Sequence, residues 1–99
     1  MGYNIRFHPA AEEEYLKAYQ WYEEHLEGLG DRFGRSVERQ INLISKNPEH
    51  YQLKKRNCRE SKVDVFPYVI VYKVYQPTNN ILIVAVFHTS RKPGKKYRK

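Results

Sequence analysis

The side chains best suited to chemistry in this chain are cations, and they gather in its second half. Residues 1–50 carry nine carboxylates against six Lys or Arg side chains, a balance of −3. Residues 51–99 carry two carboxylates against twelve Lys or Arg, a balance of +10, so the formal net charge is +7. This asymmetry indicates a polyanion or an acidic protein as the partner of the second half, although solvated lysines are the simpler alternative.

Two groups in the second half could act on an anion or a proton. A basic cluster at residues 54–59 could bind phosphate, and a loop of solvated charges explains it equally well. It consists of Lys54, Lys55, Arg56 and Arg59. His88 and Arg91 form a polar end to the apolar stretch 62–91, where a histidine could serve as a general acid or base near neutral pH. Structural roles stay open for both, because His88 could simply end a strand and Arg91 could pair with Asp64.

Metal and thiol chemistry have little support in the sequence. The four histidines are scattered and have no set of cysteines beside them, so we expect no metal site and no cofactor; they are His8, His25, His50 and His88. The one cysteine, Cys58, lies among Arg56, Arg59 and Lys62, whose charges could lower the pKa of its thiol. We favour a structural role as a small filler residue.

Length and composition are those of one folded domain. Ninety-nine residues can bury one modest core, and 40% apolar with 14% aromatic side chains exceeds what a disordered chain carries. The first ten residues do not resemble a signal peptide, and no apolar run approaches the roughly 20 residues that a membrane helix needs. We therefore expect a single domain over residues 1–99, a cytoplasmic location and no membrane partner.

Hydrophobic periodicity predicts two helices in the first half. Apolar side chains recur every three or four residues from Ala10 to about Glu27 and again from Asp31 to Lys46. Gly28 and Gly30 separate the two segments, and Asp31 is the expected N-cap of the second. Helices joined by so short a loop must run antiparallel, as a helical hairpin.

Four segments have the composition of strands. Residues 3–8 alternate apolar and polar side chains, as do residues 62–66 and 68–75, while residues 81–87 are apolar at every position. A turn-rich segment at 77–80 separates the last two. A strand that is apolar on both faces is normally central, so the last strand should lie between neighbours, with the first as one of them. The predicted fold class is α+β: an N-terminal strand, an antiparallel helical hairpin, then a three-strand antiparallel meander in the same sheet.

The predicted sheet has more apolar surface than two helices can cover. The hairpin covers one face, yet the segments 68–75 and 81–87 have apolar side chains for both faces. We expect the second face to be exposed. Exposed apolar sheet usually marks a binding surface, so this pattern predicts a protein ligand.

The order of several short motifs resembles the RelE/ParE superfamily of toxins from type II toxin–antitoxin systems, and its ParE-like branch in particular. The motifs are Phe7-His8-Pro9 with Ala11, Gly28-Leu29-Gly30 with Phe33, Asn47-Pro48, Arg59, Phe66-Pro67-Tyr68 with Tyr72, and finally His88, Arg91 and Pro93. The resemblance covers almost the whole chain. It rests on the order and spacing of the motifs together, since none is specific alone.

This resemblance implies a bacterial toxin that a cognate antitoxin, encoded by an adjacent gene, neutralises. ParE-like toxins are taken to block DNA gyrase by binding, which requires a docking surface rather than a catalytic residue. By similarity, the surface that binds the target, or phosphate groups on it, would consist of Arg56, Arg59, Arg91, Lys95, Lys96 and Arg98. The antitoxin-facing residues would be Trp21, Tyr68, Ile70 and Tyr72.

RelE-like relatives imply a second function, the metal-independent cleavage of mRNA in the ribosome. In that reaction a 2′-hydroxyl attacks the adjacent phosphate while side chains move protons and stabilise charge. The residues that would carry it are Lys62, Arg91 and Tyr97, with His88 as a substitute acid or base. Two expected cation positions hold Glu60 and Val69, and losing one positioned group costs about 100- to 1,000-fold in rate. Gyrase inhibition is therefore favoured, mRNA cleavage is the alternative, and a non-toxic nucleic-acid-binding module is a minor one.

Overall fold

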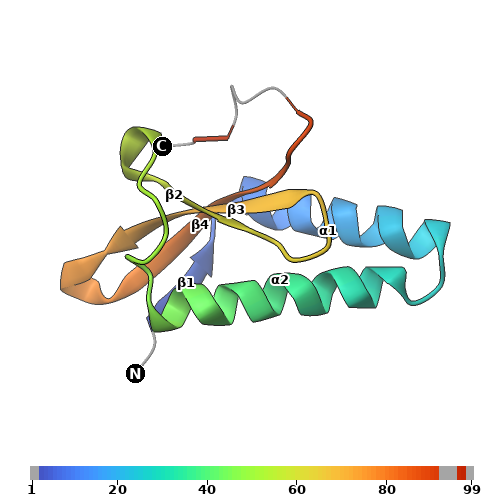
Figure 1. The fold of residues 1–99 in the computed structure, drawn as a ribbon, viewed down its shortest axis with the longest axis horizontal. Coiled ribbons are helices and arrows are strands. Elements are labelled where there is room, and N and C mark those ends of the chain that lie inside the picture. Colours follow the sequence, from blue (N-terminus) through green and yellow to red (C-terminus); the bar gives the residue numbers. More distant parts are fainter. Residues whose placement is uncertain (1–2, 92–95, 98–99) are drawn as a thin grey trace.

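Four strands form one mixed sheet in the order β1-β4-β3-β2 (Figure 1). The strands are β1 (Asn4–Phe7), β2 (Arg59–Lys62), β3 (Tyr68–Tyr75) and β4 (Asn80–His88). In this computed structural model, which describes residues 3–91 and 96–97, β1 runs parallel to β4 while β2, β3 and β4 form an antiparallel meander. The predicted α+β class is confirmed, and so is the central position of the apolar strand β4.

Two helices cover one face of this sheet. Helix α1 (Pro9–His25) and helix α2 (Leu29–Lys46) follow β1 directly. Their apolar side chains meet the inner faces of β3 and β4 in the main core, which includes Phe33, Ile44, Ile70, Tyr72, Ile83 and Val86. Neither helix is long and apolar enough to span a membrane, and the described residues contain no other helix that is.

The start of α2 differs from the prediction. The helix begins at Leu29, and its N-cap is Gly28, whose φ of +86° suits glycine, rather than Asp31. The carboxylate of Glu23 on α1 accepts hydrogen bonds from the N–H groups of Gly28 and Gly30, both at 2.9 Å. A side chain from the neighbouring helix thus replaces the expected local cap. Asp31 instead accepts a hydrogen bond from the Tyr19 hydroxyl.

The predicted strand at 62–66 is wrong. Strand β2 ends at Lys62, which pairs with Val69, and the intervening residues form a tight loop closed by a 2.9 Å hydrogen bond from the Val63 N–H to the Tyr68 carbonyl. Val65, at the tip, has a φ of +74° and a side chain that is 78% exposed. The alternation of Val63 and Val65 therefore reflects one buried residue and one turn residue.

The second face of the sheet is covered, contrary to the expectation of an exposed apolar face. Val71, Val84 and Ala85 are fully buried on that face, where Cys58 and Tyr97 pack against them. Figure 1 shows the short coloured stretch at residues 96–97 on the opposite side of the sheet from α2. The chain therefore supplies its own second layer, and the argument from an uncovered sheet face to a protein ligand does not hold.

Candidate functional site

A groove of about 740 Å³ lies between α1 and the ends of β3 and β4. We call it the α1–β4 groove. Its lining includes Lys17, Trp21 and Tyr22 from α1, Tyr68 from β3, and His88 and Arg91 at and after the end of β4. It therefore joins an aromatic wall to a cationic end.

The groove exists because β1 is shorter than β4. Strand β1 ends at Phe7, opposite Ile83, so β1 does not pair with the part of β4 that follows. The last contact is the hydrogen bond from the His8 N–H to the Ile83 carbonyl, at 2.8 Å. Beyond it, the Val86 N–H donates to Oε1 of Glu14 on α1, at 3.0 Å. The Glu14 side chain of α1 thus accepts a backbone hydrogen bond at a position where a neighbouring strand would otherwise accept it.

The aromatic wall presents the one tryptophan of the chain. Trp21 is 54% exposed, and its ring stacks on His25 at a centroid distance of 3.8 Å and meets Tyr22 edge-on at 5.2 Å. The His25 Nδ1–H donates to the Trp21 carbonyl at 2.7 Å. Tyr22 in turn packs on Phe66 in the core. The exposed indole is therefore held in place from two sides.

The cationic end contains His88 and Arg91. The backbone N–H of Ser90 donates to Nδ1 of His88 at 3.1 Å, which leaves the proton of the neutral ring on Nε2. The His88 ring lies edge-on to Tyr68, with centroids 5.0 Å apart. Burial raises the pKa of Tyr68, and the charge of Arg91 offsets part of that rise. His88 thus stands at the end of its strand, in contact with Tyr68 and Ser90, and Arg91 is exposed at the groove.

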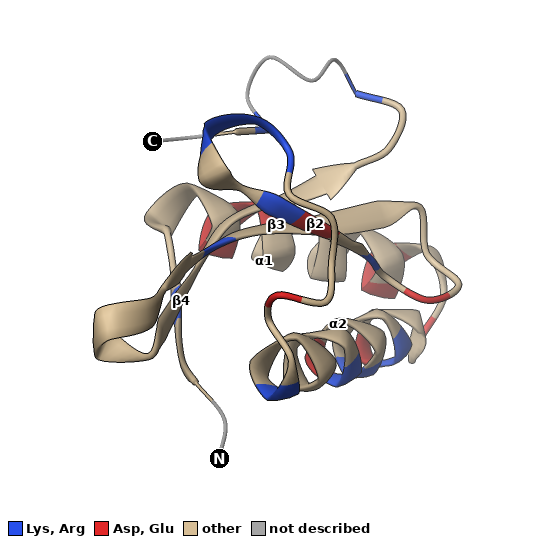
Figure 2. Cartoon of the chain, turned by 60° about the vertical axis from the view of Figure 1, so that its left-hand side comes forward, with Lys and Arg blue, Asp and Glu red and all other residues tan. Residues whose placement is uncertain are grey.

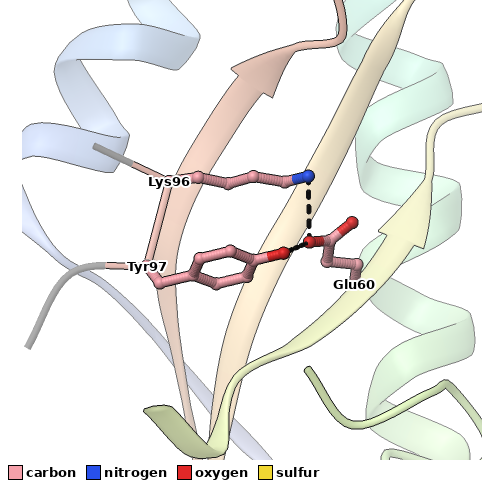
Figure 3. Close-up of polar contacts among 3 residues, drawn as sticks. All are labelled: Glu60, Lys96 and Tyr97. Carbon is pink, nitrogen blue, oxygen red and sulfur yellow. Dashed lines mark hydrogen bonds and ion pairs between the residues drawn. The ribbon is translucent and has the colours of Figure 1, made fainter. Parts of the chain in front are cut away.

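A second polar cluster holds the C-terminal segment on the other face of the sheet (Figure 3). The Tyr97 hydroxyl donates to Oε2 of Glu60 on β2, and Nζ of Lys96 lies 2.9 Å from the same oxygen. We call these three residues the C-terminal clasp. The side chains of Lys96 and Glu60 are only 19% and 13% exposed. Burial, and then the bond to Glu60, raise the pKa of Tyr97 to about 12.

The residues expected for mRNA cleavage are divided between the two faces of the sheet. Tyr97 lies in the clasp, and Lys62 shares that face because it stands two residues after Glu60 in β2. His88 and Arg91 instead line the α1–β4 groove. A base, an acid and a cation must lie within hydrogen-bond reach of one substrate, and this arrangement separates them.

Two of the four residues expected to face an antitoxin are in the core. Ile70 and Tyr72 have no exposed surface, because their strand positions point toward the helices. The Tyr72 hydroxyl donates to the Pro48 carbonyl at 2.6 Å and fastens the end of α2 to the sheet. That part of the prediction is wrong. Trp21 and Tyr68 do lie at the surface, and both line the groove.

The expected phosphate-binding cations that the structure describes have different surroundings. Nη1 of Arg59 donates to the carbonyls of Tyr51 at 2.6 Å and Glu49 at 3.3 Å, so this side chain organises the chain after α2. Arg56 is exposed in a short turn with a φ of +57°, and Lys96 is committed to the clasp. Lys95 and Arg98 lie outside the described residues.

Thiol and metal chemistry find no site in the described residues. Cys58 is fully buried, and burial raises the pKa of its thiol even though Lys73 and Arg56 act in the opposite direction. This supports the filler interpretation. Residues 3–91 and 96–97 hold no group of three His, Cys, Asp or Glu side chains that could bind a metal ion.

The roles of Glu60 and Glu14 were not foreseen from the sequence. Glu60 is one of only two carboxylates in a half that carries twelve cations, so a specific ionic partner could have been suspected. Glu14 belongs to a glutamate run that a helix start explains fully. Nothing in the run marks Glu14 as the side chain that reaches the edge of β4.

The fold is that of the RelE and ParE toxins. A chain of the chromosomal ParDE toxin–antitoxin system from P. aeruginosa superposes with a TM-score of 0.73 at 13% identity, over 89% of this chain and 97% of that one. The isolated RelE toxin of E. coli superposes with a TM-score of 0.68 at 19% identity, over 91% and 87%. A chain of the intact E. coli RelBE complex gives 0.68 at 20% identity, over 90% and 99%.

Sequence comparison narrows this class to one family. Residues 5–93 match the family described as the ParE toxin of the type II toxin–antitoxin system parDE. The chain belongs to that family and is the toxin component of a type II toxin–antitoxin system. Comparison with curated proteins gives no match.

Proposed function

We propose that this toxin acts by binding DNA gyrase through the α1–β4 groove, and that its cognate antitoxin neutralises it by covering the same groove. The observation that carries the proposal is the pairing of a half-exposed Trp21 with Arg91 across one concave surface. Tryptophan, tyrosine and arginine are the residues that most often dominate the binding energy of protein interfaces. Trp21 is also held by its neighbours, which reduces the entropy lost on binding.

Binding is favoured over mRNA cleavage by the division of the expected catalytic residues. Lys62 and Tyr97 lie on one face, and His88 and Arg91 on the other. The raised pKa of Tyr97 makes its hydroxyl a weak acid, poorly matched to proton transfer near neutral pH. The carboxylate of Glu60, next to that hydroxyl, would also repel a phosphate.

An antitoxin partner is supported by the solved relatives. The superposed chains come from a ParDE system of P. aeruginosa and from the intact RelBE toxin–antitoxin complex of E. coli. The proposal places this partner in the groove rather than on the second face of the sheet, where Cys58 and Tyr97 pack. The exposed Trp21 provides apolar contacts for it, and Arg91 in the same groove provides a charged one.

The proposal is tested with two assays on one preparation of the toxin. We expect inhibition of gyrase-catalysed supercoiling with accumulation of cleaved DNA, reversed by the antitoxin encoded beside the toxin gene. A Trp21→Ala variant should require at least tenfold more protein for the same inhibition, since hot-spot tryptophans contribute about 2 kcal/mol or more. Ribosome-dependent cleavage of mRNA by a toxin that leaves gyrase active would contradict the proposal.

A further inference from the structure

Three arginines form a stripe along the outer side of α2. Arg32, Arg35 and Arg39 are spaced by three and four residues, so they share one face of the helix and span about 10.5 Å at 1.5 Å per residue. All three side chains are exposed. Figure 2 shows blue segments recurring along α2. We call these residues the arginine stripe.

No carboxylate neutralises the stripe within the part of the chain that the structure describes. The ion pairs there join Lys17 to Glu13 and Lys96 to Glu60. Of the acidic residues on the same helix, Asp31 contacts α1. Asp31 accepts the Tyr19 hydroxyl, while burial, followed by the charges of Glu38 and Asp31, raises the pKa of Tyr15 on α1. The three like charges therefore stand together without an ion pair among the described residues, which favours an external anion.

A hollow of about 210 Å³ adjoins the stripe, between α2 and the loop after β2. Its walls are the three arginines, Ser36, Val65 and Phe66. Val65 is unusual because a β-branched residue is held at a φ of +74° with most of its side chain in solvent. Backbone strain of this kind costs on the order of 1–3 kcal/mol and persists only where the surroundings enforce it. Here it presents an apolar side chain beside the guanidinium groups.

We infer that the arginine stripe and its hollow bind an acidic segment of the cognate antitoxin, with carboxylates on the arginines and one apolar side chain against Val65. This inference rests on the proposed function, because it assumes the antitoxin as partner. Charge complementarity supports it, since the toxin has a net charge of +7 and the stripe has no internal counter-ion among the described residues. Guanidinium groups bind carboxylates through paired hydrogen bonds.

The position of the hollow also fits a partner that covers the α1–β4 groove. Val65 and Phe66 line the hollow, and the next two residues, Pro67 and Tyr68, line the groove. A segment that leaves the groove over this loop would reach the stripe directly. One antitoxin chain could therefore occupy the groove with apolar residues and the stripe with acidic ones.

A protein segment fits this surface better than nucleic acid. Three arginines would release about three counter-ions, fewer than the six to ten phosphate contacts that give strong salt-dependent binding. The exposed Val65 has no complement in a sugar–phosphate backbone, whereas it can contact an apolar side chain.

The test compares two triple variants that change the net charge equally. R32E/R35E/R39E reverses the stripe, and R6E/K54E/K55E reverses three exposed cations elsewhere. Affinity for the purified antitoxin is measured by calorimetry at 50 and 200 mM salt, with circular dichroism as the check on folding. We expect the stripe variant to bind about 100-fold more weakly and the control variant to stay within about threefold of the wild type. A milder R32Q/R35Q/R39Q variant should lie between the wild type and R32E/R35E/R39E.

The outcomes separate the inference from the proposed function. Equal affinity of the stripe and control variants for the antitoxin overturns the inference alone. A wild-type toxin that does not bind the antitoxin overturns the antitoxin part of the proposed function, and the inference with it. If a 16-base-pair duplex binds the wild type and loses affinity in the stripe variant while antitoxin binding is unchanged, the stripe is a nucleic-acid surface and the inference is wrong.

Discussion

Removing the side chain of Tyr97 should destabilise the whole fold, because the clasp holds the layer that covers the second face of the sheet. Truncating a fully buried aromatic side chain to alanine costs about 3–5 kcal/mol. Tyr97 is half-buried against the cluster of Val71, Val84 and Phe87, so we take about half of that, about 2 kcal/mol. Losing its hydrogen bond to Glu60 adds about 1 kcal/mol. Tyr97→Ala should therefore cost about 3 kcal/mol, and Tyr97→Phe about 1 kcal/mol.

Urea unfolding measures these differences directly. Trp21 is the only tryptophan and reports on α1, while circular dichroism reports on both helices, so two probes follow one transition. Both variants should keep the wild-type dependence of unfolding free energy on urea concentration. Their midpoints should fall to lower urea, by less for Tyr97→Phe than for Tyr97→Ala. If Tyr97→Ala unfolds within about 0.5 kcal/mol of the wild type, which is the usual effect of a surface substitution, the C-terminal segment does not support the sheet. That result would refute the clasp.

Three further results are expected from the same structure. Gly30→Ala should destabilise the protein by about 2 kcal/mol, because an added Cβ would lie 2.8 Å from the Tyr19 carbonyl oxygen. A variant with the wild-type midpoint in chemical denaturation would contradict that close packing. Cys58 should react with a thiol reagent only as fast as the protein unfolds, and rapid labelling in native buffer would show that it is accessible. The pKa of Tyr97, raised to about 12, adds stability that is complete below about pH 10, the ordinary tyrosine value, and is lost as the pH rises toward 12. The stability gap between wild type and Tyr97→Phe should therefore shrink across that interval, and a constant gap would refute the assignment.

Much of the fold could be predicted because its elements carry strong local patterns. The continuous apolar run of β4 indicated a central strand, and the heptad-like spacing in α1 and α2 indicated a hairpin. The prediction of a strand at residues 62–66 failed because Val63 is buried in the core whereas Val65 lies in a turn. The start of α2 was predicted wrongly because the Glu23 carboxylate, seven residues before Gly30, accepts the hydrogen bond that a local N-cap side chain would accept. Residue preferences near the helix start do not predict a contact with the preceding helix.

The site was harder to predict because it depends on which face of the sheet each side chain occupies. Tyr97 follows Arg91 by six residues, yet the two side chains lie on opposite faces of the sheet. Ile70 and Tyr72 are alternate residues of β3 and so share one face of the sheet. Only the packing of the helices shows that this face is buried. Composition shows that apolar surface exists, and not which segment of the same chain covers it.

The most direct test of the account measures inhibition of gyrase supercoiling by three proteins side by side. The wild type and Tyr97→Phe should inhibit alike, because Tyr97 lies in the clasp, away from the groove. Trp21→Ala should inhibit at least tenfold less, because its indole is the exposed aromatic of the groove. Full inhibition by Trp21→Ala, or its loss in a folded Tyr97→Phe, would contradict the assignment of function to the α1–β4 groove.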